Sequence, residues 1–439
     1  MGLGGGVWTG QDKILPGAYI NFVAAARPGS GIGERGVVAL PMALDWGAVG
    51  EVVTVTQQEF YRYAERLFGY TYDAPQMINL REVFKNALKV LVYRLANGAM
   101  AASNDYATAK YPGARGNDIK IVVAPNIDLA NQFDVSTVVG KKIVDTQTIQ
   151  AASGLIANDW VVFDPEAPLT PTAGTPLTGG SNGDAPTGAE YQGALDAFEN
   201  CYFNVLALPI EEDAYTQSVK SVYTAYTRRL RDEEGIKFQL VCYRYAEADY
   251  EAVASVENAV VGTNPAAAVY WTAGALSNAA VNTSLSNTPY NGEYEVGTAY
   301  TQFQLEEGIL AGKFLFHKVG DEVRVLTDIN TLTTITEGKN EDFKSNQTCR
   351  IIDEIGTSIA RIFNNDFFGK VPNDSAGRVA LWSRIVEHHK TLETMRALEN
   401  FNPDDVAVAA GESKKSVVVN DAITVVGIME KLYMTVVVQ

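Results

Sequence analysis

The stretch Tyr202-Phe-Asn-Val-Leu-Ala-Leu208 decides the fold class, together with the segments on either side of it. It is short, apolar and rich in aromatic and branched residues, which is typical of a buried strand. Helical patterns flank it at 189–199 and 212–234, and a second apolar run follows at 237–243. Strands that alternate with helices predict a mainly parallel sheet with both faces covered, so we expect an α/β middle domain.

The same alternation extends along the chain in both directions. Upstream, the patterns predict helices over 56–68 and 80–87 and a strand over 89–95. Downstream, they predict a helix near 249–258 and a strand over 267–271. Sequence on both sides therefore contributes to the α/β core.

A module of short strands interrupts the alternation. Four β runs, each bounded by Gly, Asn, Asp or Pro, occur at 119–123, 133–139, 142–149 and 160–163. Short strands without a convincing helix between them predict a small β-sandwich or barrel. Residues 165–188 then hold five prolines and five glycines, which excludes a continuous helix or a central strand. We interpret 101–186 as an inserted module that ends in a linker and lies decoupled from the core.

The last part of the chain combines helices with terminal strands. Two long amphipathic patterns predict helices over 343–363 and 375–398, and apolar runs predict strands over 416–419, 422–426 and 432–439. A further strand is predicted near the other end, within 14–23. The expected divisions are 1–23 (an arm), 24–100 (the first αβ part of the core), 101–186 (the insertion), 187–330 (the middle domain) and 331–439 (the C-terminal domain).

Charge and composition exclude several classes of function. The 439 residues carry 52 acids and 35 bases, a net charge of −17, whereas nucleic-acid binders and anionic-membrane binders need a basic footprint. Most of the excess acid lies in 187–330, with 20 acids against 9 bases. Three widely spaced cysteines form neither a disulfide framework nor a metal knuckle, and we expect no secretion signal and no membrane span.

Two glycine-rich motifs resemble phosphate-binding loops but stand in the wrong context. Gly31-Ile-Gly33-Glu-Arg-Gly36 matches G-x-G-x-x-G, yet a strand-like run and Pro41 follow where a helix should begin. We interpret it as a hairpin turn. The second motif, 308–314, is one residue short between its glycines and has Phe314 where a magnesium-binding hydroxyl belongs, so a helix-to-strand connection is preferred.

The histidines give little support for catalysis or metal binding. The chain has only His317, His388 and His389. His389 and Glu393 could share a helix face, but His389 lies on the apolar stripe and the H-E-x-x-H order is absent, which favours a packed or surface histidine. No serine stands in a G-x-S-x-G turn. We therefore expect no catalytic, cofactor-binding or metal-binding residue, no cofactor and no enzymatic activity.

The chain begins and ends in strand-forming segments, and the last of them contains little charge and no proline that would protect it from pairing with another strand. An unprotected edge strand can pair with another chain, and a tethered terminal strand can add to a neighbour's sheet. The alternative, left open by the residues alone, is that both strands pair within their own domain. Exchange between identical subunits is heterologous and produces a ring or an open helical polymer.

Several short blocks together resemble a known family. These blocks are Leu15-Pro-Gly-Ala-Tyr19, Lys110-Tyr-Pro-Gly-Ala-Arg-Gly-Asn-Asp-Ile119, Leu177-Thr-Gly-Gly-Ser-Asn-Gly183, Ile329-Asn-Thr-Leu-Thr-Thr334 and Phe368-Gly-Lys-Val-Pro-Asn373. In this order, and with the inserted β module, the chain resembles a contractile phage tail sheath protein over nearly its whole length. It is similar to the shorter sheaths of myophages, defective prophages and R-type bacteriocins.

The resemblance implies a multidomain α/β fold. It has a middle domain of subtilisin-like topology without catalytic machinery, an inserted β-sandwich and an α+β C-terminal domain. It also implies that both terminal arms donate strands to neighbours. The implied donor residues are Leu15, Tyr19, Phe22, Leu432, Tyr433, Val436 and Val438. The implied acceptor residues are Val417, Val419, Ile423 and Val425. A helix over 375–398, with Arg378 and Arg384, would face the tail tube.

The implied function is a structural subunit that polymerises around a tail tube and contracts to drive the tube through a bacterial envelope. Its partners would be further copies of itself, the tube protein, and baseplate and tail terminator proteins, without nucleic acid or membrane binding. It would be assembled in the host cytoplasm into a virion tail or tail-like particle. The alternatives are the sheath of an R-type bacteriocin, an adaptor that forms only a ring, or an acidic α/β enzyme with an appended β-domain and a cationic substrate.

Overall fold

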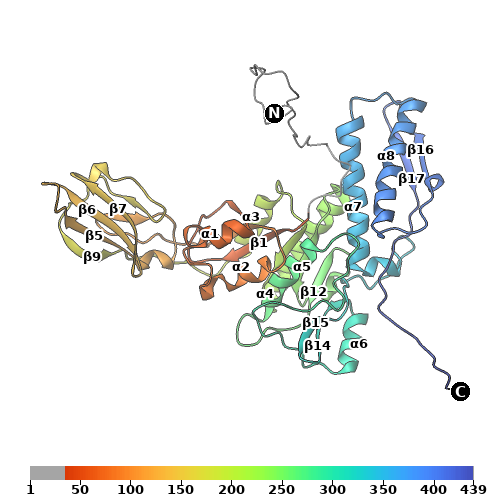
Figure 1. Cartoon of the computed structure of the whole chain (residues 1–439), viewed down its shortest axis with the longest axis horizontal. Coiled ribbons are helices and arrows are strands. Elements are labelled where there is room, and N and C mark those ends of the chain that lie inside the picture. The colour runs from red at the N-terminus through yellow and green to blue at the C-terminus, as the bar shows by residue number, and fades with distance from the viewer. Residues whose placement is uncertain (1–34, 439) are drawn as a thin grey trace, which may run out of the picture.

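The computed structural model describes residues 35–438. Its three parts follow one another along the longest axis (Figure 1). The β insertion lies at one end, the α/β core lies in the middle, and two long helices with a small sheet form the other end. None of the helices within residues 35–438 combines the length and the hydropathy that a membrane-spanning segment requires.

A seven-stranded sheet organises the core, in the order β13-β12-β11-β10-β1-β3-β2. All neighbouring strands are parallel except β2, which runs antiparallel to β3. The predicted mainly parallel sheet is thus confirmed. The strands are β1 Val37–Ala43, β2 Val52–Thr56, β3 Lys89–Leu95, β10 Val205–Leu208, β11 Gln239–Tyr243, β12 Val253–Val256 and β13 Lys313–Phe314.

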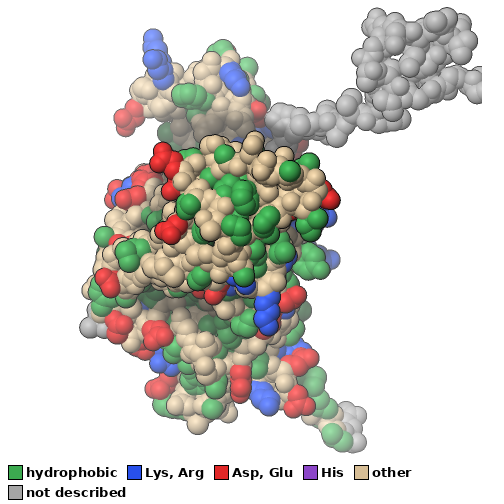
Figure 2. Space-filling view, turned by 90° about the vertical axis from the view of Figure 1, so that its left-hand side faces the viewer, with side chains coloured by type: hydrophobic (Ala, Val, Ile, Leu, Met, Phe, Trp, Pro, Cys, Tyr) green, Lys and Arg blue, Asp and Glu red, His purple; other side chains and the backbone are tan. Residues whose placement is uncertain are grey.

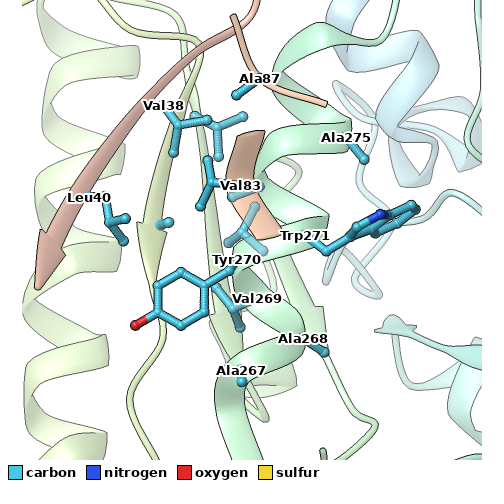
Figure 3. Close-up of a cluster of buried hydrophobic side chains, with 14 of the residues drawn as sticks. Val38, Leu40, Val83, Ala87, Ala267, Ala268, Val269, Tyr270, Trp271 and Ala275 are labelled. Carbon is cyan, nitrogen blue, oxygen red and sulfur yellow. The ribbon is translucent and has the colours of Figure 1, made fainter. Parts of the chain in front are cut away.

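Helices cover both faces of this sheet. Because successive side chains of a strand point to opposite faces, each strand contributes apolar residues to the hydrophobic core on either side. In β1, Val38 and Leu40 face the core beneath the first group of helices, α1 Gln57–Phe68, α2 Ile78–Phe84 and α5 Ala268–Asn278 (Figure 3). Val37 and Ala39 face the opposite core, which α3 Gly188–Phe198 and α4 Ala214–Arg228 cover. Two apolar layers therefore hold the core together.

Two predictions in this domain are wrong, because a helix was predicted where a strand forms and a strand was predicted where a helix forms. The segment predicted as a helix near 249–258 contains strand β12, and the segment predicted as a strand over 267–271 begins helix α5. Ten of the eleven residues of α5 are buried, so this helix has no polar face that would reveal a helical period. The other predicted core segments match α1, α2, β3, α3, β10, α4 and β11 within a few residues.

Pro41 does not end the strand that contains it, although we expected a proline at this position to act as a breaker. β1 continues through Pro41 to Ala43 and pairs along its full length with β3. On the other side, β10 pairs only with Val38 and Ala39. Pro41 therefore lies beyond the β10 ladder, where the missing N–H removes no hydrogen bond between strands.

The insertion contains the four predicted strands in two small sheets. One sheet has the order β7-β6-β5-β9 and the other pairs β4 with β8. The strands are β4 Ala107–Ala109, β5 Ile119–Pro125, β6 Phe133–Val139, β7 Lys142–Ile149, β8 Val161–Phe163 and β9 Thr172–Pro176. The interpretation of 165–188 as only a linker is wrong, because β9 lies within it. As the edge strand of its sheet, β9 accommodates proline.

The insertion is anchored to the core rather than decoupled from it. Trp46, from the loop after β1, is fully buried in the core of the insertion, with its ring 5.1 Å from that of Trp160 and 5.4 Å from that of Tyr111. The Arg94 guanidinium, on β3, donates hydrogen bonds of 2.7–2.9 Å to the carbonyls of Leu44, Gly47 and Pro112. A shared core and a buried arginine therefore fix the base of the insertion.

The free end of the insertion exposes apolar side chains. Figure 2 views the molecule from this end and shows hydrophobic side chains at the front, with few charges among them. Exposed large apolar residues of the insertion include Ile127, Ile143 and Ile156.

The C-terminal part contains the two predicted long helices, α7 Asn346–Ile362 and α8 Ser375–Thr394. They pack with the antiparallel pair β16 Val406–Ala410 and β17 Val417–Asp421 around Ile385. Helix α6 Gln302–Leu310 and the hairpin β14 Phe316–Val319 with β15 Glu322–Val325 lie beside the core sheet. Strands predicted at 422–426 and 432–439 do not form within residues 422–438, apart from one bridge between Val425 and Leu398.

Buried charge joins α7 to the core. Arg350 and Asp328 form an ion pair of 2.8 Å, and each side chain is only 1% exposed. Arg231, after α4, forms a second pair of 2.7 Å with Asp353. Removing one partner of a buried pair leaves an uncompensated charge, so these contacts strongly disfavour separation of α7 from the core.

Candidate subunit interface

The described residues do not gather into a cluster of metal-ligating side chains. Among residues 35–438, no group of three or more His, Cys, Asp or Glu side chains could hold a metal ion. Residues 31–34 of the first glycine motif lie outside the described residues, so its interpretation as a hairpin turn stays a prediction. In the second motif, α6 leads through Gly312 into β13, which confirms the predicted helix-to-strand connection.

The histidines of α8 stabilise the C-terminal domain. The Nε2 atom of His389 is 2.7 Å from Oδ2 of Asp421 at the end of β17, and its Nδ1 is 3.3 Å from Nδ1 of His388. Both histidines are buried, which confirms the packed interpretation for His389. Glu393 does not join them, because its Oε1 accepts a hydrogen bond from the N–H of Phe401. His317 lies apart on β14.

The predicted acceptor residues lie in two neighbouring segments. Val417 and Val419 belong to β17, where they are half-buried on the side that faces α8. Ile423 and Val425 follow in an irregular segment and pack beside Ile351 and Leu392. The N–H of Val426 donates to the carbonyl of Ala397, so this segment runs beside 397–399 without forming a full ladder.

The sheet of β16 and β17 has two free edges within the described chain. Its strands pair with each other from Val406 opposite Asp421 to Ala410 opposite Val417, and neither pairs with a third strand among residues 35–438. Two-stranded sheets are marginally stable alone. Packing on α8 supports one face, while the edges leave main-chain donors and acceptors available to added strands.

The C-terminal donor residues lie on an exposed, extended segment. Leu432, Tyr433, Val436 and Val438 are 69–90% exposed, and residues 431–438 belong to no strand. Figure 1 shows this segment leaving from the end of α7 that lies away from β16 and β17. The N-terminal donor residues Leu15, Tyr19 and Phe22 lie outside the described residues.

Arg378 and Arg384 lie on α8 and contact their own domain. Arg384 donates to Glu387 at 2.6 Å and to Asp366 at 3.2 Å. Arg378 donates to the carbonyl and the side-chain oxygen of Asn373, at 3.2 and 3.1 Å. Both arginine side chains are half-buried. The two carboxylates partly neutralise Arg384, whereas the oxygens of Asn373 hold Arg378 at the surface of its own domain.

The block Phe368-Gly-Lys-Val-Pro-Asn373 shapes the start of β17, a role that periodicity does not reveal. The Asn373 amide donates to the carbonyls of Lys414 and Ser416. The block also lines a pocket of about 420 Å³ together with Arg378, Lys414 and Val417. In the sequence, only the resemblance of this block to the family indicated that the segment has a specific role.

The block Ile329-Asn-Thr-Leu-Thr-Thr334 connects the core to α7. Thr331 exchanges hydrogen bonds with the main chain of Tyr250, and the Asn330 amide donates to the carbonyl of Phe343 just before α7. Asp249 accepts hydrogen bonds from the N–H groups of Thr333 and Thr334. Although burial opposes ionisation, these donors hold the pKa of Asp249 well below its usual value.

Four family models match the chain in order and cover almost all of it. Residues 35–95 match the tail sheath protein Gp18 domain III N-terminal region, and 96–182 match the phage tail sheath protein beta-sandwich domain. Residues 184–331 match the phage tail sheath protein central domain, and 338–439 match the phage tail sheath C-terminal domain.

Individual proteins resemble the chain over its whole length. The phage-like element PBSX protein XkdK of Bacillus subtilis strain 168 is 33% identical, and the match covers 99% of both chains. The crystal structure of the sheath tail protein from Desulfitobacterium hafniense is 38% identical, with a TM-score of 0.82 over 95% of this chain and 99% of that one. The contracted helical sheath of the anti-feeding prophage shares the fold, with a TM-score of 0.57 at 13% identity over 97% and 99% of the two chains.

Proposed function

The chain belongs to the phage tail sheath protein family, and we propose that it polymerises helically around a tail tube and contracts to drive the tube through a bacterial envelope. In this proposal the extended polymer is metastable and persists behind a kinetic barrier until a baseplate signal releases it. The coarser function is established by family: the protein is a structural component of a contractile phage tail or tail-like particle.

An enzymatic function is not supported. The family and the structural neighbours are structural sheath proteins, which argues against the alternative of an acidic α/β enzyme. The mainly parallel sheet with helices on both faces supports the subtilisin-like topology that we propose for the middle domain. Either a phage or an R-type bacteriocin-like particle could use such a subunit.

The observation that carries the proposal is that one subunit has both free strand edges and an extended terminal segment that pairs with nothing in the described chain. The sheet of β16 and β17 has two open edges, while the apolar segment 431–438 has no partner in its own chain among the described residues. Each added main-chain hydrogen bond contributes about 0.5–1.5 kcal/mol net. Donation to a neighbour, repeated in every subunit, would therefore join the polymer while other surfaces slide.

We propose the partners of the subunit on the same basis of family membership and exposed surfaces. Copies of the chain would exchange strands, α8 with Arg378 and Arg384 would face the tube, and the ends of the polymer would meet baseplate and terminator proteins. The exposed Val379 on α8 supports a contact on this helix. Assembly would take place in the host cytoplasm.

Strand donation is tested by one residue of the arm. Val436→Pro removes a main-chain donor and is incompatible with a central strand position, so we expect association to weaken about tenfold per contact. Val436→Thr keeps a β-branched side chain and the N–H, and should assemble like the parent. Sedimentation measures assembly, and electron microscopy identifies striated tubes.

Truncations provide the stronger version of this experiment. Variants that lack residues 432–439 or residues 1–20 should remain folded, as measured by circular dichroism, and monomeric, as measured by sedimentation. Tubes of normal length from either truncation would refute donation by that arm.

A further inference from the structure

Glu430 ties the base of the C-terminal arm to the core. Its Oε1 accepts a hydrogen bond of 2.5 Å from the Ser286 hydroxyl. The Thr327 hydroxyl lies 3.1 Å from both carboxylate oxygens. Although Glu430 belongs to the C-terminal domain in sequence, its partners belong to the core, where Ser286 follows α5 and Thr327 lies just after β15.

The two hydroxyls are held in place by buried neighbours. The Ser286 oxygen accepts hydrogen bonds from the N–H of Asp328 and from the Ser284 hydroxyl, so its own proton is directed to Glu430. Thr327 is buried, and Asp328 is the partner of Arg350 in the ion pair that joins α7 to the core. The receiving site is therefore fixed by the same network that docks the C-terminal domain.

Glu430 is an isolated point of attachment. Before it, Val426 is held by the N–H···O bond to Ala397 and accepts one from the Gln347 amide. Between these anchors, Gly427, Ile428 and Met429 are exposed, and Met429 is fully so. After Glu430, residues 431–438 have no hydrogen bond or ion pair with the described chain.

We propose that Glu430 is the residue that positions the donor arm, by fixing where it leaves the subunit and how far it reaches. This inference rests on the strand donation proposed above. With Glu430 bound, residues 431–438 can span about 26–29 Å, whereas release at Glu430 frees 427–438, which can span about 40–43 Å. The arm thus has two lengths, and the longer one lets a donated strand stay paired when neighbouring subunits move apart.

Lys431 offers a direct assay of this attachment in the monomer. Trypsin cleaves after lysine only where the flanking chain can enter its active site, so cleavage after Lys431 requires release of the adjacent Glu430. We expect Glu430→Ala to accelerate the release of residues 432–439, followed by mass spectrometry, about five- to tenfold, since it removes two hydrogen bonds. Glu337→Ala removes an exposed carboxylate without a described partner and is the control.

Two further variants separate this attachment from general destabilisation. Glu430→Gln keeps an acceptor oxygen and should restore much of the protection. Thr327→Val removes the donor from the other side, and its effect should not add to that of Glu430→Ala, because both changes break the same contact. Equal cleavage rates for Glu430→Ala and Glu337→Ala would overturn the proposal, whatever the polymer does.

The positioning role needs a second readout. A tether of twelve rather than eight residues lowers the effective concentration of the donor strand about twofold, so Glu430→Ala should raise the critical concentration for tube formation by about that factor. Faster cleavage with an unchanged critical concentration would overturn the positioning role. Tubes formed by the variant that lacks residues 432–439 would instead refute strand donation and leave the attachment intact.

Discussion

His388 is buried next to a second histidine and lacks a full set of partners. When His389 donates a hydrogen bond from Nε2–H to Asp421, its Nδ1 accepts a hydrogen bond from Nδ1–H of His388. The Nε2 atom of His388 then stays buried without a hydrogen bond. Burial first, then the neighbouring His389, lowers the pKa of His388 to about 4, with Arg361 acting in the same direction and Asp421 against it.

This shift predicts loss of stability in acid. The unfolded chain binds a proton at His388 near pH 6.5 and the folded chain only near pH 4, so stability is fully present above pH 6.5 and falls as the pH approaches 4. We expect a loss on the order of 3 kcal/mol from this residue. Urea unfolding of the monomer at several pH values measures it.

His388→Gln should remove most of this pH dependence while lowering stability at pH 7. His317→Gln, on the half-exposed strand β14, is the matched control and should leave the dependence largely in place. An unchanged slope between pH 6.5 and 4 in His388→Gln would contradict the assignment.

At the scale of elements, helix α5 packs unusually close to α2. A Cβ on Gly274 would lie 2.3 Å from the carbonyl oxygen of Val83, a main-chain atom that cannot turn aside. Figure 3 shows the neighbouring Val83 and Tyr270 in this cluster. Glycine at this position therefore sets the distance between the two helices.

A pair of substitutions tests this close approach. Gly274→Ala should destabilise the monomer by about 1–3 kcal/mol, since it forces two buried helices apart. Gly356→Ala, in α7, meets no atom within 4 Å and should stabilise by about 0.5–1 kcal/mol, because alanine favours a helix. Chemical denaturation compares the two, and a neutral Gly274→Ala would show that the helices are free to shift.

Elements with one buried face were predictable, and elements buried all round were not. The capped helix α1 follows from Thr56, Glu59 and the stripe of Phe60 and Ala64. Helix α5 gives no such stripe, so the alanine-rich run at 267–271 was mistaken for a strand. The segment 422–426 has the composition of a strand, but composition does not supply a partner to pair with.

At the scale of the whole molecule, the insertion is an extension of the core that is attached through a narrow base. Its two connections to the core run side by side, since the N–H of Asp184 donates to the carbonyl of Asn97 at 2.9 Å. Trp46, from the loop after β1, packs into the hydrophobic core of the insertion and is covered by it. We expect the insertion to lie at the outer surface of a sheath.

Removing the insertion should leave a subunit that polymerises, provided that the apolar surface which the insertion covers is also made polar. Joining Asn97 to Asp184 through a short glycine link preserves the geometry of the core, but it uncovers Trp46. We expect the deletion to aggregate with Trp46 present and to assemble once Trp46→Ser is added, because an exposed apolar patch promotes association. Sedimentation and electron microscopy decide the outcome, and a folded, soluble double variant without tubes would assign an assembly role to the insertion.

The sequence by itself determined the α/β alternation, the inserted β module, the contexts that exclude phosphate loops and the order of the family blocks. All of these are local patterns, which depend on residues close together in the chain. Only the tertiary structure decided that α5 is a helix, that Trp46 and Arg94 anchor the insertion, and that Glu430 holds the arm to the core. These contacts join residues far apart in sequence, and no periodicity encodes which distant group a buried or charged side chain will meet.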